Sequence, residues 1–160
     1  MSLAQGRSYL AIPGPSVMPD EGELHALTDS LIPDLKAVAR TAGDVAIYIG
    51  NGHAAWEASV ANLCARGDTV MVLATGRFGH GWADMARGLG VKVEVLDFGQ
   101  TDAVDLTRVA EALAADTQGA IKAVMVCQTD TSTGVRNDVK GLRATLDAAG
   151  PDALLMVACL

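Results

Sequence analysis

Short apolar segments alternate with amphipathic segments along most of this chain, and the alternation limits the folds it can adopt. From residue 44 onward, runs rich in Val, Ile and Leu alternate with stretches whose apolar residues recur at helical spacing. The expected strands are Val45–Ile49, Thr69–Ala74, Val91–Val95, Ile121–Cys127 and Ala153–Val157, and the expected helices are Ala54–Arg66, Gly79–Leu89, Asp105–Asp116 and Asp138–Ala149. Such a sequence predicts an α/β fold with three layers, a parallel or mixed sheet with helices on both faces.

Prolines set the first residues of the chain apart. Three of the five prolines lie within Leu10–Pro19, and proline lacks the amide hydrogen that a helix or a central strand needs. We therefore expect residues 1–20 to form an arm laid over the surface. A helix should follow, with leucines at helical spacing from Leu24 to Leu35, and Pro33 should kink it or restart it.

Composition indicates a globular protein that does not act on nucleic acids. Half of the 160 residues are apolar and 19% are charged, which is enough to form the core of one domain. The net charge of −7 argues against binding to nucleic acid or to an anionic membrane. The N-terminus has no signal-peptide pattern, and Cys64, Cys127 and Cys159 are interpreted as buried thiols in a reducing compartment. The expected location is the cytoplasm.

The loop Gly50-Asn51-Gly52-His53 comes directly after an expected strand and opens an expected helix. In open parallel sheets, ligands bind at the carboxyl ends of the strands. Glycines allow a ligand to approach the backbone, and a helix N-terminus offers free amides and a partial positive charge. The loop therefore indicates a phosphate site, although many glycine-rich turns of this kind bind nothing.

The same loop also fits the dinucleotide-binding pattern G-x-G-x-x-A. That pattern expects an acidic residue about 20 positions later, at the end of the second strand. The second expected strand here ends Leu73-Ala74-Thr75-Gly76, and Asp68 lies before the strand. A single phosphate is therefore favoured over a nicotinamide dinucleotide.

Two further strand-end loops carry side chains suited to a flat, oxygen-rich ligand. Phe78 lies among glycines after the second strand, where its ring can stack on a heterocycle or anchor the next helix. The loop Gln128–Gly134 is rich in hydroxyls, which can bind an oxyanion or only turn the chain. Arg77 and His80 are expected to face solvent.

Taken together, these residues resemble the class V aminotransferases, and among them the alanine–glyoxylate and serine–glyoxylate enzymes. The motifs occur in the family's order along nearly the whole chain. They are Ile12–Pro15, Tyr48–Glu57, Arg66–Leu73, Gly76–Gly79 and Asp130–Gly134. The resemblance implies the large domain of a fold-type-I enzyme that uses pyridoxal 5′-phosphate (PLP), working as a homodimer on small amino-acid and 2-oxo-acid substrates.

The resemblance also implies roles for individual residues. The backbone amides of Gly52 and His53 would hold the PLP phosphate, and Asn51 would line that loop. Phe78 would stack on the pyridine ring. Thr131 would donate its hydroxyl to the phenolic oxygen of the cofactor.

Other features of the family pattern are altered or missing. Gly14 of the arm matches the pattern and would lie near the substrate carboxylate. Ala158 departs from the pattern, because it stands where the family has an aspartate that pairs with the pyridine nitrogen. The lysines are expected at the starts of strands or within helices, so none matches the Schiff-base lysine. About a dozen residues of the family pattern are missing between Asp20 and Glu21. We assign no catalytic residue and no metal ligand.

The expected parent activity is transamination from alanine or serine to glyoxylate or another 2-oxo acid. Residues 21–160 would then be part of a PLP-binding large domain whose C-terminal part is absent, and the chain alone should be inactive. Three alternatives stay open: another PLP reaction such as a lyase or desulfurase, a non-enzymatic phosphate- or nucleotide-binding domain, and a truncation product without function.

Overall fold

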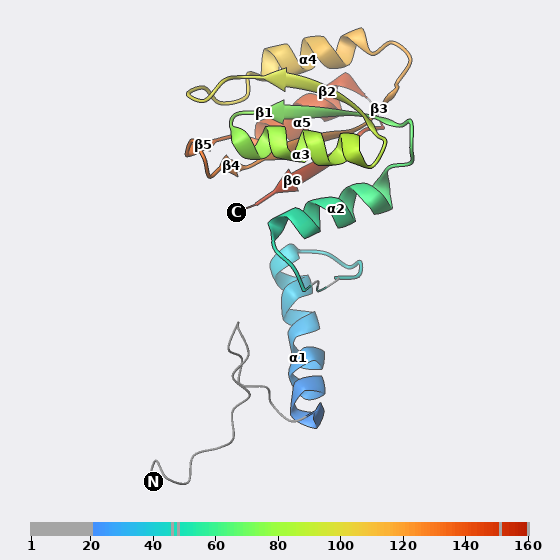
Figure 1. The fold of residues 1–160 in the computed structure, drawn as a ribbon, viewed down its shortest axis with the longest axis vertical. Coiled ribbons are helices and arrows are strands. Elements are labelled where there is room, and N and C mark those ends of the chain that lie inside the picture. Colours follow the sequence, from blue (N-terminus) through green and yellow to red (C-terminus); the bar gives the residue numbers. More distant parts are fainter. Residues whose placement is uncertain (1–20, 46, 48, 151, 160) are drawn as a thin grey trace. The chain divides into compact units, whose positions relative to one another are not determined.

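The chain divides into two compact units, Met1–Ile47 and Tyr48–Leu160. The computed structural model describes residues 21–45, 47, 49–150 and 152–159, so the expected arm and Gly14 lie outside the described residues. In the first unit, α1 (Glu21–Ala39) is one continuous helix with Pro33 inside it (Figure 1). Of the two effects predicted for Pro33, a kink or a restart, the restart does not occur, because good helix formers such as Leu31 and Leu35 flank the proline on both sides.

A four-stranded parallel sheet forms the centre of the second unit (Figure 1). Its strands, in spatial order, are β2 (Lys92–Asp97), β1 (Thr69–Ala74), β3 (Ile121–Cys127) and β6 (Leu154–Ala158). In the parallel register, Ala74 pairs with Asp97, and Cys127 pairs with Ala158. All four carboxyl ends therefore lie along one edge of the sheet.

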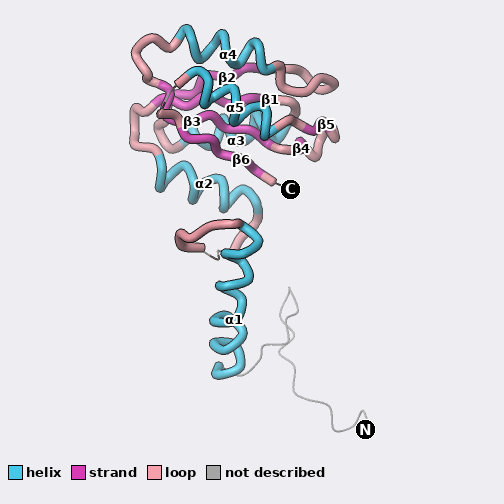
Figure 2. The backbone as a smooth tube through the Cα atoms, turned by 180° about the vertical axis from the view of Figure 1, so that it is seen from behind, coloured by secondary structure: helices cyan, strands magenta, loops and turns pink. Residues whose placement is uncertain are grey.

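Helices cover both faces of this sheet, which confirms the predicted three layers. They are α2 (Gly52–Leu63), α3 (Arg77–Gly88), α4 (Leu106–Ala115) and α5 (Val139–Ala149). Alternate residues of β1 point to opposite faces: Val70 and Val72 pack with residues of α2 and α3, and Met71 and Leu73 pack with residues of α4 and α5. The view in Figure 2, from behind, shows α4 and α5 on the face opposite α3.

The predicted strand Val45–Ile49 is wrong at its described positions. Val45, Ile47 and Ile49 are not in a strand, and the side chains of Ile47 and Ile49 are 57% and 106% exposed. A strand persists only where a neighbouring strand accepts its backbone hydrogen bonds. No described strand pairs with this segment, so its strong β propensity is not sufficient.

A short hairpin that the sequence did not reveal interrupts the loop after β3. Its strands, β4 (Thr129–Asp130) and β5 (Val135–Arg136), pair antiparallel. Gly134, with φ 74°, takes the left-handed conformation that glycine adopts readily at the turn. The hairpin brings the hydroxyl-rich residues back toward the end of β1.

Leu146 tests the core between the sheet and α5. Its side chain is fully buried, so Leu146→Ala should lower the free energy of unfolding by about 2–5 kcal/mol through lost burial and a residual cavity. Leu154→Ala is the matched control, because Leu154 is 45% exposed and should cost less than about 1 kcal/mol. Urea unfolding of both variants measures the difference, and equal losses would contradict the core described here.

Candidate functional site

Three segments that are distant in sequence meet at the carboxyl edge of the sheet. The ring centroids of His53, in the first turn of α2, and Phe78, at the start of α3, are 6.2 Å apart. The amide of Phe78 donates to Oδ2 of Asp130, 52 residues later, at 2.9 Å. The structure thus brings together the Gly50–His53 loop, Phe78 and the loop that carries Thr131, as strand-end loops were expected to do.

The first turn of α2 leaves two backbone amides without an acceptor. Asn51 is its N-cap residue, and its Oδ1 and carbonyl oxygen both accept from the amide of Ala54, at 3.2 and 3.0 Å. Within the described residues, the amides of Gly52 and His53 have no partner. Free amides at the positive end of a helix dipole attract an anion.

Gly50 allows the close turn into this helix. A Cβ atom at Gly50 would lie 2.7 Å from Cβ of Ala54, which is closer than two carbon atoms approach. The glycine is therefore required by the lack of space beside α2.

The other helices of the second unit begin against a carboxylate. Asp130 accepts from the amides at the start of α3, and Asp105 accepts from Thr107 and Arg108 at the start of α4. Asp138 accepts from Gly141 at the start of α5. Among the described residues of the second unit, α2 is therefore the helix whose cap is a neutral side chain and whose N-terminus can accept a negative charge.

Phe78 rests on a cluster of aromatic rings. It packs edge to face against Trp56, with ring centroids 6.0 Å apart and an interplanar angle of 77°. Trp56 in turn stacks on Trp82 at 5.4 Å and contacts His53 at 4.7 Å. Phe78 is half-buried, so it anchors α3 and also presents ring surface to the site, and the two interpretations from the sequence are compatible.

Thr131 lies on a tight turn between β4 and β5. Its side chain is exposed and makes no hydrogen bond within the described residues. The neighbouring hydroxyls are engaged: Oγ of Ser132 donates to Asp130, and Oγ1 of Thr133 donates to the carbonyl oxygen of Thr75. Thr131 therefore carries the hydroxyl of this turn that is available to a ligand, whereas Ser132 and Thr133 stabilise the loop.

Ala158 lies at the carboxyl end of β6, where an acidic side chain was the family expectation. It is buried and pairs with Cys127, and its carbonyl oxygen accepts from the amide of Gln128 at 2.8 Å. A hollow of about 450 Å³ between α2 and β6 is lined by Gly52, Trp56 and Ala158 among others. A methyl group therefore occupies the lining position expected for the carboxylate.

The described lysines lie away from the strand-end loops, as the sequence predicted. Lys92 and Lys122 lie at the beginnings of β2 and β3, and Lys36 and Lys140 lie in α1 and α5. Nζ of Lys122 donates to Oδ2 of Asp68 at 2.7 Å, at the amino end of the sheet. Among the described residues, no group of His, Cys, Asp or Glu is arranged to hold a metal ion.

The dinucleotide interpretation finds no support in this geometry. The end of β1 leads to Thr75, which is buried and accepts from Nδ2 of Asn137 at 3.0 Å, with no acidic residue beside it in sequence. The described residues before Gly50 form no strand. Arg77 and His80 are exposed, as expected. Nε2 of His80 lies 3.2 Å from Oδ2 of Asp97.

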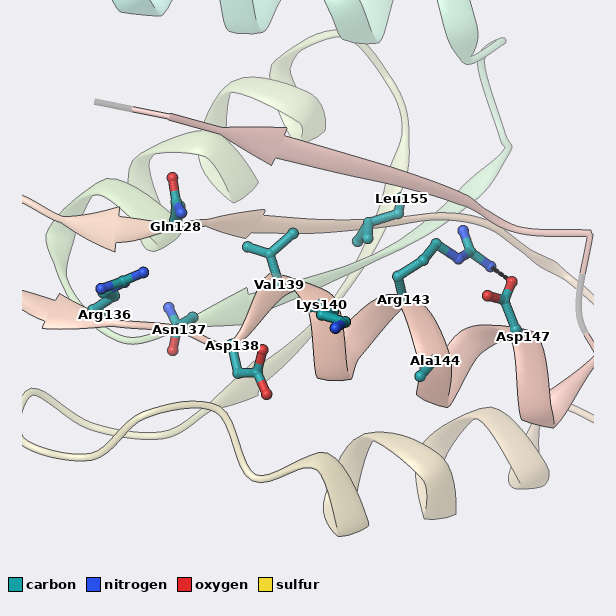
Figure 3. A pocket seen from close by; sticks show the side chains of 10 residues that line it. All are labelled: Gln128, Arg136, Asn137, Asp138, Val139, Lys140, Arg143, Ala144, Asp147 and Leu155. Carbon is teal, nitrogen blue, oxygen red and sulfur yellow. Dashed lines mark ion pairs between the residues drawn. The ribbon is translucent and has the colours of Figure 1, made fainter. Parts of the chain in front are cut away.

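A second hollow, of about 910 Å³, lies beside α5 and contains none of the predicted site residues. Figure 3 shows Lys140, Arg143 and Asp147 on α5 and Leu155 on β6 around it. Arg143 is paired with Asp147 at 2.6 Å, and Asp138 caps the helix start. The positive charge around this hollow is therefore partly neutralised by Asp147 and Asp138. The phosphate site predicted from the sequence lies elsewhere.

The three cysteines differ in their environments. Burial, together with the nearby carboxylate of Asp130, raises the pKa of Cys127 to about 12. Burial also raises the pKa of Cys64, which follows the last residue of α2 in extended backbone and is half-buried. Cys159 follows β6 and is exposed, so the prediction of three buried thiols is wrong for this residue, because no described element covers it.

Thiol labelling tests this difference. The thiolate is the reactive form, so Cys127 should resist iodoacetamide at pH 8 in the folded protein and become reactive only as the pH approaches its raised pKa or the protein unfolds. Cys159 should be modified first. Peptide mass spectrometry measures both, and equal labelling of Cys127 and Cys159 at pH 8 would contradict the described burial.

Comparison with known proteins gives one consistent family. The family described as "Aminotransferase class-V" matches residues 38–158. The chain is 37% identical to the serine–glyoxylate aminotransferase of Methylorubrum extorquens over 95% of its own length and 42% of that protein. It is 40% identical to the serine–glyoxylate aminotransferase of Hyphomicrobium methylovorum over 93% of its length and 40% of that protein.

A solved structure agrees. The crystal structure of the alanine–glyoxylate aminotransferase of Nostoc sp. superposes with a TM-score of 0.73 and 28% identity, over 86% of this chain and 35% of that one.

The chain spans less than half the length of these curated relatives. The match to the Methylorubrum protein extends over 167 aligned positions, more than the 160 residues of this chain. That relative therefore carries residues inside the matched span that this chain lacks. A shortening at Asp20–Glu21 stays a prediction for where they fall. No helix among the described residues has the length and apolar character needed to cross a membrane.

Proposed function

Since the chain belongs to the class V aminotransferases, we propose that it forms the PLP-binding part of a transaminase. The observation that carries the proposal is the pair of unpartnered amides of Gly52 and His53, on the helix N-terminus that lacks a carboxylate, beside the ring of Phe78. The structure thereby offers the same ligand two amide donors for an anionic group and one aromatic ring to stack on.

The described residues fit the phosphate, the ring and the phenolic oxygen of PLP. Gly52 and His53 would hold the phosphate through their amides, with Asn51 fixing the turn. Phe78 would lie against the ring, supported from behind by Trp56. Thr131 would donate its free hydroxyl to the phenolic oxygen. When bound, PLP supplies an electron sink for reactions at the α-carbon of an amino acid.

The described residues lack the two side chains that make PLP catalytic, an acid at the ring nitrogen and a Schiff-base lysine. The methyl group of Ala158 cannot pair with a protonated ring nitrogen, and the described lysines lie at strand beginnings or in helices. No proton-transfer step is therefore assigned to this chain. We expect it to bind PLP reversibly, with the parent activity depending on residues beyond those present here.

For the parent protein we propose transfer of an amino group from alanine or serine to glyoxylate or another 2-oxo acid. The names of the relatives support this choice, because they include serine–glyoxylate and alanine–glyoxylate aminotransferases. We also propose a cytoplasmic homodimer in which Gly14 lies near the substrate carboxylate, as the sequence resemblance implies.

A desulfurase is not favoured, since the family that matches this chain and its named relatives are aminotransferases. A phosphate-binding domain without PLP is not favoured either, because such a domain gives no reason for Phe78 and Thr131 to accompany the amides.

The two phenylalanines provide a matched test of PLP binding. Titration with PLP should quench the fluorescence of Trp56 and Trp82, which lie beside Phe78. Phe78→Leu should weaken PLP binding roughly two- to tenfold, the range expected from losing one aromatic pair. Phe98→Leu should leave it unchanged, because Phe98 packs on the opposite face of the sheet.

Borohydride reduction provides the second part of the test. After reduction and dialysis, we expect no stoichiometric adduct on Lys36, Lys92, Lys122 or Lys140. A stoichiometric adduct on one lysine would contradict the claim that none of these four residues is the Schiff-base lysine. A lack of PLP binding by the wild-type protein would overturn the proposed function.

A further inference from the structure

We propose that Asp130 is the positioning residue of this site, whose buried carboxylate fixes the ring of Phe78 and the hydroxyl of Thr131 relative to each other. The inference rests on the proposed function, since it assigns both groups to one PLP molecule. It adds a residue that touches neither the cofactor nor the substrate.

The carboxylate of Asp130 is fully buried and accepts four hydrogen bonds. Oδ2 accepts from the amides of Phe78 and Gly79 at 2.9 and 3.0 Å. Oδ1 accepts from the amide and the hydroxyl of Ser132 at 3.1 and 2.6 Å. Oγ of Ser132 accepts in turn from the amide of Arg77 at 2.9 Å. The first three amides of α3 therefore all end on the Asp130–Ser132 pair.

This arrangement replaces a local helix cap. The N-cap residue of α3 is Gly76, which has no side chain to accept a hydrogen bond. A carboxylate from the β4–β5 hairpin takes that place. Capping by a distant residue ties two loops together, whereas capping by the preceding residue would tie α3 only to itself.

Gly76 shows how closely the two loops approach. A Cβ atom at this position would lie 2.5 Å from Cγ of Asp130 and 2.8 Å from Oγ of Ser132. Its backbone is extended, with φ 167°, so the glycine is needed for space and not for its conformation. The loop of Phe78 is therefore packed directly on the carboxylate.

Asp130 fixes the turn that carries Thr131 through both its side chain and its carbonyl oxygen. Asp130 and Ser132, the neighbours of Thr131, are joined through their side chains. The carbonyl oxygen of Asp130 accepts from the amides of Thr133 and Gly134 at 3.1 and 2.8 Å, which closes the turn. Any displacement of Asp130 consequently moves the hydroxyl of Thr131 and releases the amide of Phe78 together.

Asp130→Asn, made in the full chain, tests the proposal. The variant keeps the shape of the side chain but turns one acceptor oxygen into a donor that faces amide donors. Without PLP, amide hydrogen exchange at Phe78 and Gly79 should accelerate about tenfold or more, as expected for losing hydrogen bonds to a charged group. With PLP, the dissociation constant should rise about tenfold, and the visible circular dichroism of the bound cofactor should weaken.

Asp105→Asn is the matched control. Asp105 also accepts from two helix amides, but it caps α4 and touches neither loop. This variant should accelerate exchange at Thr107 and Arg108 only and should leave PLP affinity and circular dichroism unchanged. A purely structural role of Asp130 would lower the melting temperature of Asp130→Asn without altering the spectrum of the cofactor bound at a temperature where the protein is folded.

A milder variant covers the case in which Asp130→Asn does not fold. Ser132→Ala removes one partner of Asp130 and the acceptor of the Arg77 amide, and it should give smaller changes of the same sign. Wild-type affinity and circular dichroism in the folded variants would overturn this inference alone. Failure of the wild-type protein to bind PLP would overturn the proposed function and the inference with it.

Discussion

The buried carboxylate of Asp130 is the interaction on which the site depends. It satisfies amides at the start of α3 and closes the hairpin turn that carries Thr131. Because it neutralises the N-terminus of α3, an anionic ligand has no binding position there. The N-terminus of α2, capped by the neutral Asn51, is left as the place where a phosphate finds free amides and a favourable dipole. Asp130 thus positions Phe78 and closes the start of α3 to an anion, as Asp105 and Asp138 close the starts of α4 and α5.

Most of the second unit could be predicted from sequence periodicity. β1 and β3 match their predicted ranges, and the helices differ only at their ends. These elements are buried on one or both faces, so apolar spacing reports directly on their packing. The segment Val45–Ile49 has the same apolar pattern, but a strand also needs a neighbour, and a linear pattern carries no information about its partner. The end of α2 shows the same limit, since its helical pattern continues to Arg66 but the helix stops at Leu63.

The site was only partly visible in the sequence. Glycines, hydroxyls and Phe78 after strands pointed to three loops, and the family resemblance picked out Gly52, His53 and Thr131 within them. The structure brings these loops together. Asp130 was missed as a functional residue because its role depends on a contact 52 residues away in sequence. The available signal was the absence of any capping side chain at Gly76, since a helix that begins with a bare glycine in the core needs an acceptor from elsewhere. The cofactor's remaining partners could not be found, because Ala158 offers no acid and the lysines lie away from the strand ends.

The central claim is that the start of α2 is the anion site and the start of α3 is closed. A titration of ¹⁵N-labelled protein with inorganic phosphate, followed by two-dimensional amide NMR, separates the two helices directly. We expect saturable shifts of the Gly52 and His53 amide signals, with the signals of Arg77, Phe78 and Gly79 unmoved. Saturable shifts at Arg77–Gly79 instead, or none at Gly52 and His53, would contradict this claim.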